Sequence, residues 1–325
     1  MKKLIAWVLL LPTLAFGAAA FAAPYSAMWV FGGPLEDLGN YASVFGNLPA
    51  PFFENRFSDG PLAVELLAQQ LGFELKPSLH RVGPVKGNDF ASADALANGP
   101  DTKDLQGQLN AYFSVSHGKA DPNAFYYMII GGNEVIAATY EQNDAKSIQI
   151  LEGAVASKKL AIHRLVGAGA KTMFIDNFFN LGRTPQLLDA GLSARATKMS
   201  QIHNAMMTQM LNQAQRDLDF NLIFFDVYQF GEDAIASADR LRITDTTDSC
   251  VALYASGKCD FQHFIFFTDL TVTSRLGELW GFQLTNEVNE NAFEVACEKA
   301  AHPHIPGFIH HFRGEAQFGH CRRKL

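Results

Sequence analysis

Short apolar runs alternate along the chain with longer segments in which apolar residues recur at helical spacing. The runs are continuous, as expected for strands that are buried on both faces of a parallel sheet. The segments between them predict amphipathic helices. This alternation predicts an α/β fold of three layers, α/β/α, in which helices cover both faces of a mostly parallel sheet. The predicted strands are residues 27–30, 125–130, 171–175 and 221–227, and the predicted helices include 105–113, 144–166, 193–216 and one that begins near Pro61, capped by Ser58 or Asp59.

The first residues carry a pattern typical of a secretory signal. Lys2 and Lys3 precede an apolar stretch over residues 4–16, and small residues follow up to Ala22. The stretch is shorter than the roughly 18–20 residues that a membrane-spanning helix needs, so we expect no transmembrane anchor. We predict that residues 1–22 are a cleaved signal peptide and that the mature protein is secreted or periplasmic.

Charge and length narrow the class of protein. The formal net charge is −7, and no stretch concentrates basic residues, which argues against nucleic acid as a partner. The whole sequence has a hydrophobic content of 48%, and the length that remains after residue 22 is enough for one large domain with a substantial core. We place this domain at residues 23–285, followed by a C-terminal extension at residues 286–325 that contains cysteine and histidine.

All four cysteines lie in the last quarter of the chain, at Cys250, Cys259, Cys297 and Cys321. In an exported protein an even number of cysteines indicates disulfide bonds. Proximity along the chain favours the pairs Cys250–Cys259 and Cys297–Cys321, and the sequence leaves free thiols open as an alternative.

The segment that follows the first predicted strand, residues 31–40, reads F-G-G-P-L-E-D-L-G-N. It resembles the first conserved block of the GDSL esterases and lipases (SGNH hydrolases), F-G-D-S-L-S-D-x-G-N, with Gly33 in place of the Asp and Pro34 in place of the nucleophilic Ser. The resemblance implies a three-layer α/β/α domain with a flavodoxin-like arrangement, and an ancestry among enzymes that hydrolyse esters. Further segments similar to family blocks follow in order, at residues 54–61, 87–95, 131–134 and 180–185.

The resemblance also implies where the catalytic groups would lie. Ester hydrolysis by a serine needs the nucleophile, a histidine that takes its proton, and a group that orients the histidine. Pro34 stands at the nucleophile position, and alignment on the aromatic pair at 266–267 puts Thr268 at the Asp position and Thr271 at the His position. Since none of these side chains can perform the corresponding task, we expect no catalytic residue.

Family enzymes also use hydrogen-bond donors that stabilise an oxyanion. The resemblance implies that these are the backbone N–H of the nucleophile, a Gly amide and an Asn side chain. Pro34 has no backbone N–H, and Asp94 stands at the Gly position, where its charge is expected to repel an oxyanion. Asn133 matches the family Asn, and we interpret Gly33, Asp94 and Asn133 as remnants of the oxyanion site and its cleft.

The C-terminal extension offers an alternative site. His302 is followed by proline, as in the family, and Glu298 lies four residues earlier, a spacing that suits one face of a helical turn. A nucleophile would have to come from elsewhere, such as Ser26, Ser58 or water. The imidazoles of His302, His304, His310 and His311 also suggest Zn²⁺ or Cu²⁺ binding, but clustered surface histidines are more often a solvated tail. We therefore expect no metal and no cofactor.

Two functions follow from these residues. The first is an exported, catalytically inactive relative of GDSL hydrolases (a pseudoenzyme) that binds a small molecule, such as an acyl chain or a glycan, or a protein. Its cleft is expected to be lined by Phe31, Phe52, Phe53 and Phe57. The alternative is a divergent ester hydrolase (lipase or acylhydrolase) whose rebuilt site uses His302 and Glu298.

Overall fold

The computed structural model describes residues 25–301, with side chains up to residue 295. Within these residues, four parallel strands form one sheet in the order β1-β2-β3-β4. All four predicted strands are confirmed, to within two residues at either end. They are β1 (Met28–Gly32), β2 (Phe125–Ile129), β3 (Thr172–Asp176) and β4 (Asn221–Phe225).

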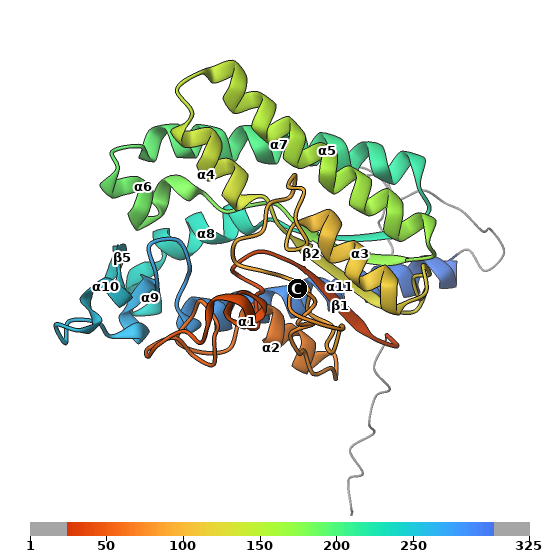
Figure 1. The fold of residues 1–325 in the computed structure, drawn as a ribbon, viewed down its shortest axis with the longest axis horizontal. Coiled ribbons are helices and arrows are strands. Elements are labelled where there is room, and N and C mark those ends of the chain that lie inside the picture. The colour runs from red at the N-terminus through yellow and green to blue at the C-terminus, as the bar shows by residue number, and fades with distance from the viewer. Residues whose placement is uncertain (1–24, 302–325) are drawn as a thin grey trace, which may run out of the picture.

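Helices cover both faces of this sheet, as Figure 1 shows, which confirms the three-layer α/β/α prediction. Side chains of successive β2 residues point to opposite faces of the sheet. Tyr127 packs in the core on one face, with the helices α2 and α11, and Tyr126 packs in the core on the other face, with α3, α5 and α7. Every residue of β2 is buried, which explains its unbroken apolar sequence. The covering helices are α2 (Ala63–Gln70), α3 (Leu105–Val115), α5 (Asp144–Gly167), α7 (Ser193–Asp217) and α11 (Ser274–Ala301).

Shorter elements connect these layers. β5 and β6 form a separate pair of parallel strands beside α10, which the sequence did not predict. Within residues 25–301 no helix combines the length and the apolar character that crossing a membrane requires. The shorter elements are α1 (Asn40–Phe45), α4 (Gly132–Tyr140), η1 (Leu181–Arg183), α6 (Pro185–Asp189), α8 (Val227–Ala236), α9 (Ala238–Leu241), β5 (Asp245–Ser249), α10 (Cys250–Tyr254), η2 (Phe261–His263) and β6 (Phe264–Phe266).

The helix predicted near Pro61 begins at Ala63, and its first turn is closed by the Leu62 N–H, which donates to Glu65 at 2.9 Å. Asp59 caps a different helix. Its carboxylate accepts hydrogen bonds from the backbone N–H and the hydroxyl of Ser274, both at 2.7 Å, at the start of α11. The predicted domain boundary at residue 285 falls inside α11, which continues to Ala301.

The predicted disulfide between Cys250 and Cys259 is confirmed, and it joins α10 to the loop that follows it. Cys297 lies in α11, but its predicted partner Cys321 is outside the described residues. The second pair therefore stays a prediction.

Candidate functional site

Pro34 lies in the wall of a pocket at the carboxyl ends of β1, β2 and β3, which is where α/β folds place their ligands. The pocket encloses about 430 Å³, part of it open to solvent. Gly33 and Pro34 reach it from the end of β1, Asn133 from the first turn of α4, and Leu270 from the loop after β6. Much of the remaining wall is apolar and includes Ile129, Ile136, Phe178, Phe179 and Leu181.

A fully buried carboxylate holds the loop between Pro34 and α1 in place. The Oδ1 atom of Asp37 accepts from the backbone N–H groups of Gly39 and Asn40, both at 2.7 Å. Its Oδ2 atom accepts from Tyr41 at 3.0 Å and from Ala93 at 2.9 Å, so it connects two segments. Burial raises the pKa of Asp37 to about 6, against the opposing effect of these N–H donors. Asp37 is one of the residues that match the first family block. Its hydrogen bonds to the backbone give it a structural role, which is enough to explain an aspartate at this position.

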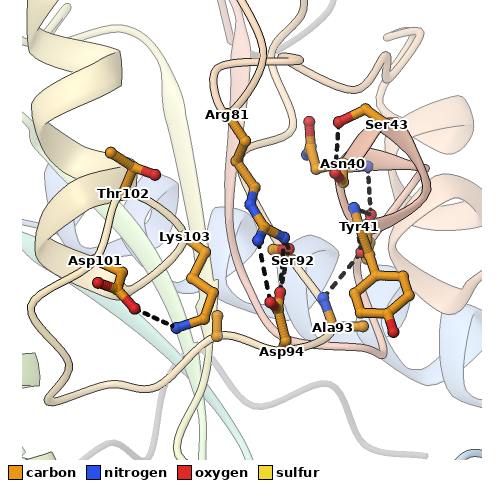
Figure 2. Close-up of polar contacts among 12 residues, drawn as sticks. Asn40, Tyr41, Ser43, Arg81, Ser92, Ala93, Asp94, Asp101, Thr102 and Lys103 are labelled. Carbon is orange, nitrogen blue, oxygen red and sulfur yellow. Dashed lines mark hydrogen bonds and ion pairs between the residues drawn. The ribbon is translucent and has the colours of Figure 1, made fainter. Parts of the chain in front are cut away.

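Asp94 does not present a free charge. Arg81 donates two hydrogen bonds to its carboxylate, Nη1 to Oδ1 at 2.7 Å and Nη2 to Oδ2 at 3.1 Å, and Ser92 donates a third at 2.9 Å (Figure 2). The guanidinium also lies over the ring of Phe45. Arg81 therefore balances the charge of Asp94. The role of Asp94 at an oxyanion site stays a prediction.

Asn133 lies in the pocket, but its amide hydrogens are already used. The Nδ2 atom lies 2.7 Å from the carbonyl oxygen of Ala95 and 3.2 Å from that of Ala93. Two carbonyl oxygens on one side of the amide fix the orientation of the side chain, since only the NH₂ group can donate to them. Asn133, the predicted oxyanion donor, thus stabilises the loop at residues 93–95 through these two hydrogen bonds.

Thr268 and Thr271 lie together, as the family alignment implies for the residues they replace. Their Oγ1 atoms are 2.8 Å apart, and the Thr268 oxygen also accepts from the Thr271 N–H at 3.0 Å. Thr271 is buried. Leu270, between them, lines the pocket with Pro34. The loop therefore brings Leu270 to the pocket wall, whereas Thr268 and Thr271 do not line the pocket and their hydroxyls bond to each other.

A buried acid in the pocket wall, Glu36, and a second one whose charge acts on it, Asp176, were missed in the sequence. Glu36 lines the pocket and accepts from the Gly33 N–H at 3.3 Å. Burial, and then the neighbouring charge of Asp176, raises the pKa of Glu36 well above its usual value. Asp176 accepts from the Tyr127 hydroxyl at 2.9 Å, and burial raises its pKa too. Raised pKa values favour the neutral acids, so they reduce the charge in this wall.

A buried amine lies behind the pocket wall at Gly131. Lys158 Nζ is 2.9 Å from Nε2 of His203, and burial lowers the pKa of Lys158 to about 7. A Cβ atom at Gly131 would come within 2.9 Å of that Nζ, and its φ of 119° also favours glycine. Neither Lys158 nor His203 lines the pocket, so the pair supports the wall and does not face a ligand.

The described residues contain a hydroxyl–imidazole hydrogen bond, between Ser78 Oγ and His80 Nδ1 at 2.6 Å. The other ring nitrogen of His80 lies 3.0 Å from the carbonyl oxygen of Thr102, which would orient it as a proton acceptor for Ser78. Ser78 is fully buried, however, and neither residue lines the pocket at Pro34. A nucleophile must be reachable by its substrate, so we interpret this pair as structural.

The predicted aromatic cleft is wrong. Phe31 is buried on the other side of β1, where it stacks on Phe90 at 5.5 Å. Phe52, Phe53 and Phe57 lie outside the pocket wall, and Phe178 and Phe179 supply its aromatic side chains instead. Side chains alternate along a strand, and the sequence does not reveal which face of β1 borders the pocket.

For the alternative site, Glu298 lies in α11 beyond the described side chains, and His302 lies outside the described residues.

Comparison with known proteins gives several related hydrolases and acyltransferases. Lipase 1 from Photorhabdus luminescens is 28% identical over 246 residues, which are 74% of this chain and 36% of that protein. Phosphatidylcholine-sterol acyltransferase from Aeromonas hydrophila is 25% identical over 257 residues, 77% of this chain and 72% of that protein. Esterase EstA from Pseudomonas aeruginosa is 29% identical over 248 residues, which are 66% of this chain and 38% of that protein. The chain thus spans little more than a third of Lipase 1 and of EstA.

A family model described as GDSL-like Lipase/Acylhydrolase matches residues 28–256. The matched region begins with β1 and contains the whole four-stranded sheet and the segments that carry Pro34, Asp94 and Asn133. It ends before Thr268 and Thr271. Since the match covers more than half of the sequence, this chain belongs to the GDSL-like lipase/acylhydrolase family.

Proposed function

We propose that the protein is an exported, catalytically inactive member of this family, which binds an acyl chain through the pocket at Pro34. The observation that carries the proposal is that Pro34, which the family resemblance assigns to the nucleophile position, lies in the pocket wall. It supplies neither a hydroxyl to attack an ester nor a backbone N–H to stabilise the resulting oxyanion. Export rests on the pattern of residues 1–22.

The surroundings of Pro34 support the loss of catalysis independently. Asn133 uses its amide hydrogens on the carbonyl oxygens of Ala93 and Ala95, so an oxyanion would have to displace one of them. Thr268 and Thr271 offer hydroxyl groups where a proton acceptor is needed. A hydroxyl group cannot act as a general base near neutral pH.

The pocket wall supports an acyl chain as the ligand in preference to a glycan or a protein. Its side chains are mostly aliphatic and aromatic, which suits an apolar ligand of small cross-section. The hydroxyl groups of a glycan would be buried there with few partners, at a cost in free energy.

The first prediction concerns catalysis. Purified protein is expected to hydrolyse p-nitrophenyl butyrate no faster than the blank and to remain unlabelled by a fluorophosphonate probe. Pro34→Ser alone is expected to stay inactive, because the proton acceptor and the oxyanion donors are still missing. Turnover above the blank that His302→Ala abolishes would contradict the proposal and establish the rebuilt site of Glu298 and His302.

The second prediction concerns binding. The protein is expected to bind cis-parinaric acid, a fatty acid whose fluorescence rises in an apolar site. Ile136→Trp places a large ring in the pocket wall and is expected to weaken binding by about tenfold or more, whereas Leu160→Trp, on the exposed side of α5, is expected to leave it unchanged. Equal affinities in the two variants would show that the fatty acid binds elsewhere.

A further inference from the structure

Three exposed apolar side chains lie close together at the end of α1. Val44 and Phe45 belong to α1 and are 42% and 60% exposed, and Val82, on the loop at residues 78–86, is 56% exposed. The guanidinium of Arg81 lies 5.6 Å from the centre of the Phe45 ring, so this loop borders the helix. We call Val44, Phe45 and Val82 the apolar patch. In Figure 1, α1 lies on the side of the domain away from α5 and α7.

Packed aromatic rings support the patch from behind. The centre of the Phe45 ring lies 4.5 Å from that of Tyr41, which contacts Phe57 at 5.4 Å. Phe57 packs against Phe52, and Phe52 packs against the buried ring of Phe267. Because these rings fill the space between Phe45 and the core, the Phe45 ring stays at the surface. The exposure of the patch is therefore a property of the fold.

The two segments that carry the patch contain no acidic residue. Residues 38–53 contain no charged residue at all, although the whole chain has 33 acidic residues and 26 lysine and arginine residues. In the loop at residues 78–86, Arg81 is paired with Asp94 at 2.7 Å, and Lys86 is exposed. The phosphate groups of lipids repel carboxylates and attract lysine, so these segments are suited to approach a phospholipid surface.

The size and the chemistry of the patch favour a lipid surface over a second protein chain. At the usual areas of such side chains its exposed parts amount to roughly 300 Å², whereas a stable protein interface buries about 800 Å² on each partner. Protein interfaces also carry about one hydrogen bond per 100–200 Å², and none of the three side chains has a polar atom. The hydrocarbon of a bilayer requires no hydrogen bonds, and exposed apolar patches are a mark of membrane contact.

We propose that the apolar patch inserts into the surface of a phospholipid bilayer and holds the protein there reversibly. Val44, Phe45 and Val82 enter the boundary between the headgroups and the acyl chains, as the apolar side chains of interfacial proteins do. Lys86 supplies a contact for the phosphate groups. None of these residues lines the pocket at Pro34, so this proposal does not depend on the binding of an acyl chain there.

Cosedimentation with phosphatidylcholine vesicles measures this binding. Phe45→Ser is expected to weaken partitioning by about tenfold, as for one ring that no longer leaves water. Leu160→Ser is the matched control, because Leu160 is 51% exposed but lies on α5, and it is expected to leave partitioning unchanged. Ile136→Trp, which obstructs the pocket at Pro34, is also expected to bind vesicles as the wild type does. This variant separates the failure of one proposal from the failure of the other.

A fluorescence measurement tests the insertion directly and does not rely on a loss of binding. With vesicles, the emission of Val44→Trp is expected to move to shorter wavelength and to be quenched by brominated phosphatidylcholine, whereas Leu160→Trp is expected to show neither effect. The proposal is overturned if the wild type does not sediment with vesicles, if Phe45→Ser and Leu160→Ser bind alike, or if the two added tryptophans are quenched equally. Dimerisation in analytical ultracentrifugation that Phe45→Ser abolishes would also overturn it, by assigning the patch to a second copy of the chain.

Discussion

Asp37→Asn is expected to lower the free energy of unfolding at pH 7.5 by about 1–3 kcal/mol. The carboxylate of Asp37 is fully buried and accepts from four backbone N–H groups, those of Gly39 and Asn40 at Oδ1 and those of Tyr41 and Ala93 mainly at Oδ2. Asparagine replaces one oxygen with an NH₂ group, so two backbone N–H groups then face a donor. Each hydrogen bond to a charged group contributes about 1.5–3 kcal/mol, and two are lost. Part of this loss is offset, because the burial that raises the pKa of Asp37 to about 6 makes its charge oppose folding at pH 7.5, and asparagine carries no charge.

Urea unfolding at pH 7.5, followed by circular dichroism, measures this loss. Asp121→Asn is the matched control, because Asp121 also accepts from a backbone N–H, that of Asn123 at 2.9 Å, but is exposed. The control is expected to change the free energy by less than about 1 kcal/mol. An equally small effect of Asp37→Asn would mean that the loop at residues 34–41 does not depend on this carboxylate.

Glu36→Gln is expected to stabilise the protein, by an amount that grows as the pH rises. Burial and the charge of Asp176 raise the pKa of Glu36 in the folded state, so the folded protein holds this proton more tightly than the unfolded chain. The resulting stabilisation is complete below the unfolded pKa of about 4.5 and is lost as the pH rises through the folded pKa. Glutamine cannot ionise, and its Oε1 atom can still accept from Gly33. Between the two pKa values the variant gains about 1.4 kcal/mol per pH unit over the wild type.

Urea unfolding from pH 4 to pH 8 tests this dependence. Glu152→Gln, on the exposed side of α5, removes the same charge from a solvated position and is expected to show a small and nearly constant difference from the wild type. A Glu36→Gln difference that does not change with pH would show that Glu36 is solvated and ionised in the folded state.

Much of the sheet could be predicted from the sequence because its strands are buried on both faces. The β2 strand is a continuous apolar run, so its start is visible in the sequence. Two glycines follow the run and mark its end. The β5 strand could not be found this way. Its sequence, Asp245–Ser249, is polar and half exposed, and it pairs with β6, which has only three residues. Its position is set by tertiary contacts and not by a periodic pattern.

At the candidate site, the sequence predicted the place of Pro34 at the end of the first strand, and the loss of catalysis stays a prediction. Proline at position 34 excludes a nucleophile in any conformation, and the structure places it in the pocket wall. The role of Asp94 was not predictable, since its partner Arg81 comes from a loop without a regular repeat. The same holds for Asn133, whose acceptors are backbone carbonyl groups. Side-chain identity reveals which bonds are available, but only the fold determines which of them form.

The contact between Asp59 and Ser274 has a consequence for how this protein acquires its structure. It joins residues 215 positions apart, at the place where α2 packs against α11. While the chain is being synthesised, α2 therefore has no helix to cover its apolar side until almost the entire domain has left the ribosome. Contacts of such long range form late and slowly, since a large loop must close before they are made. The N-terminal half thus stays incomplete until the last long helix arrives, so the domain is expected to fold only after its synthesis is nearly complete.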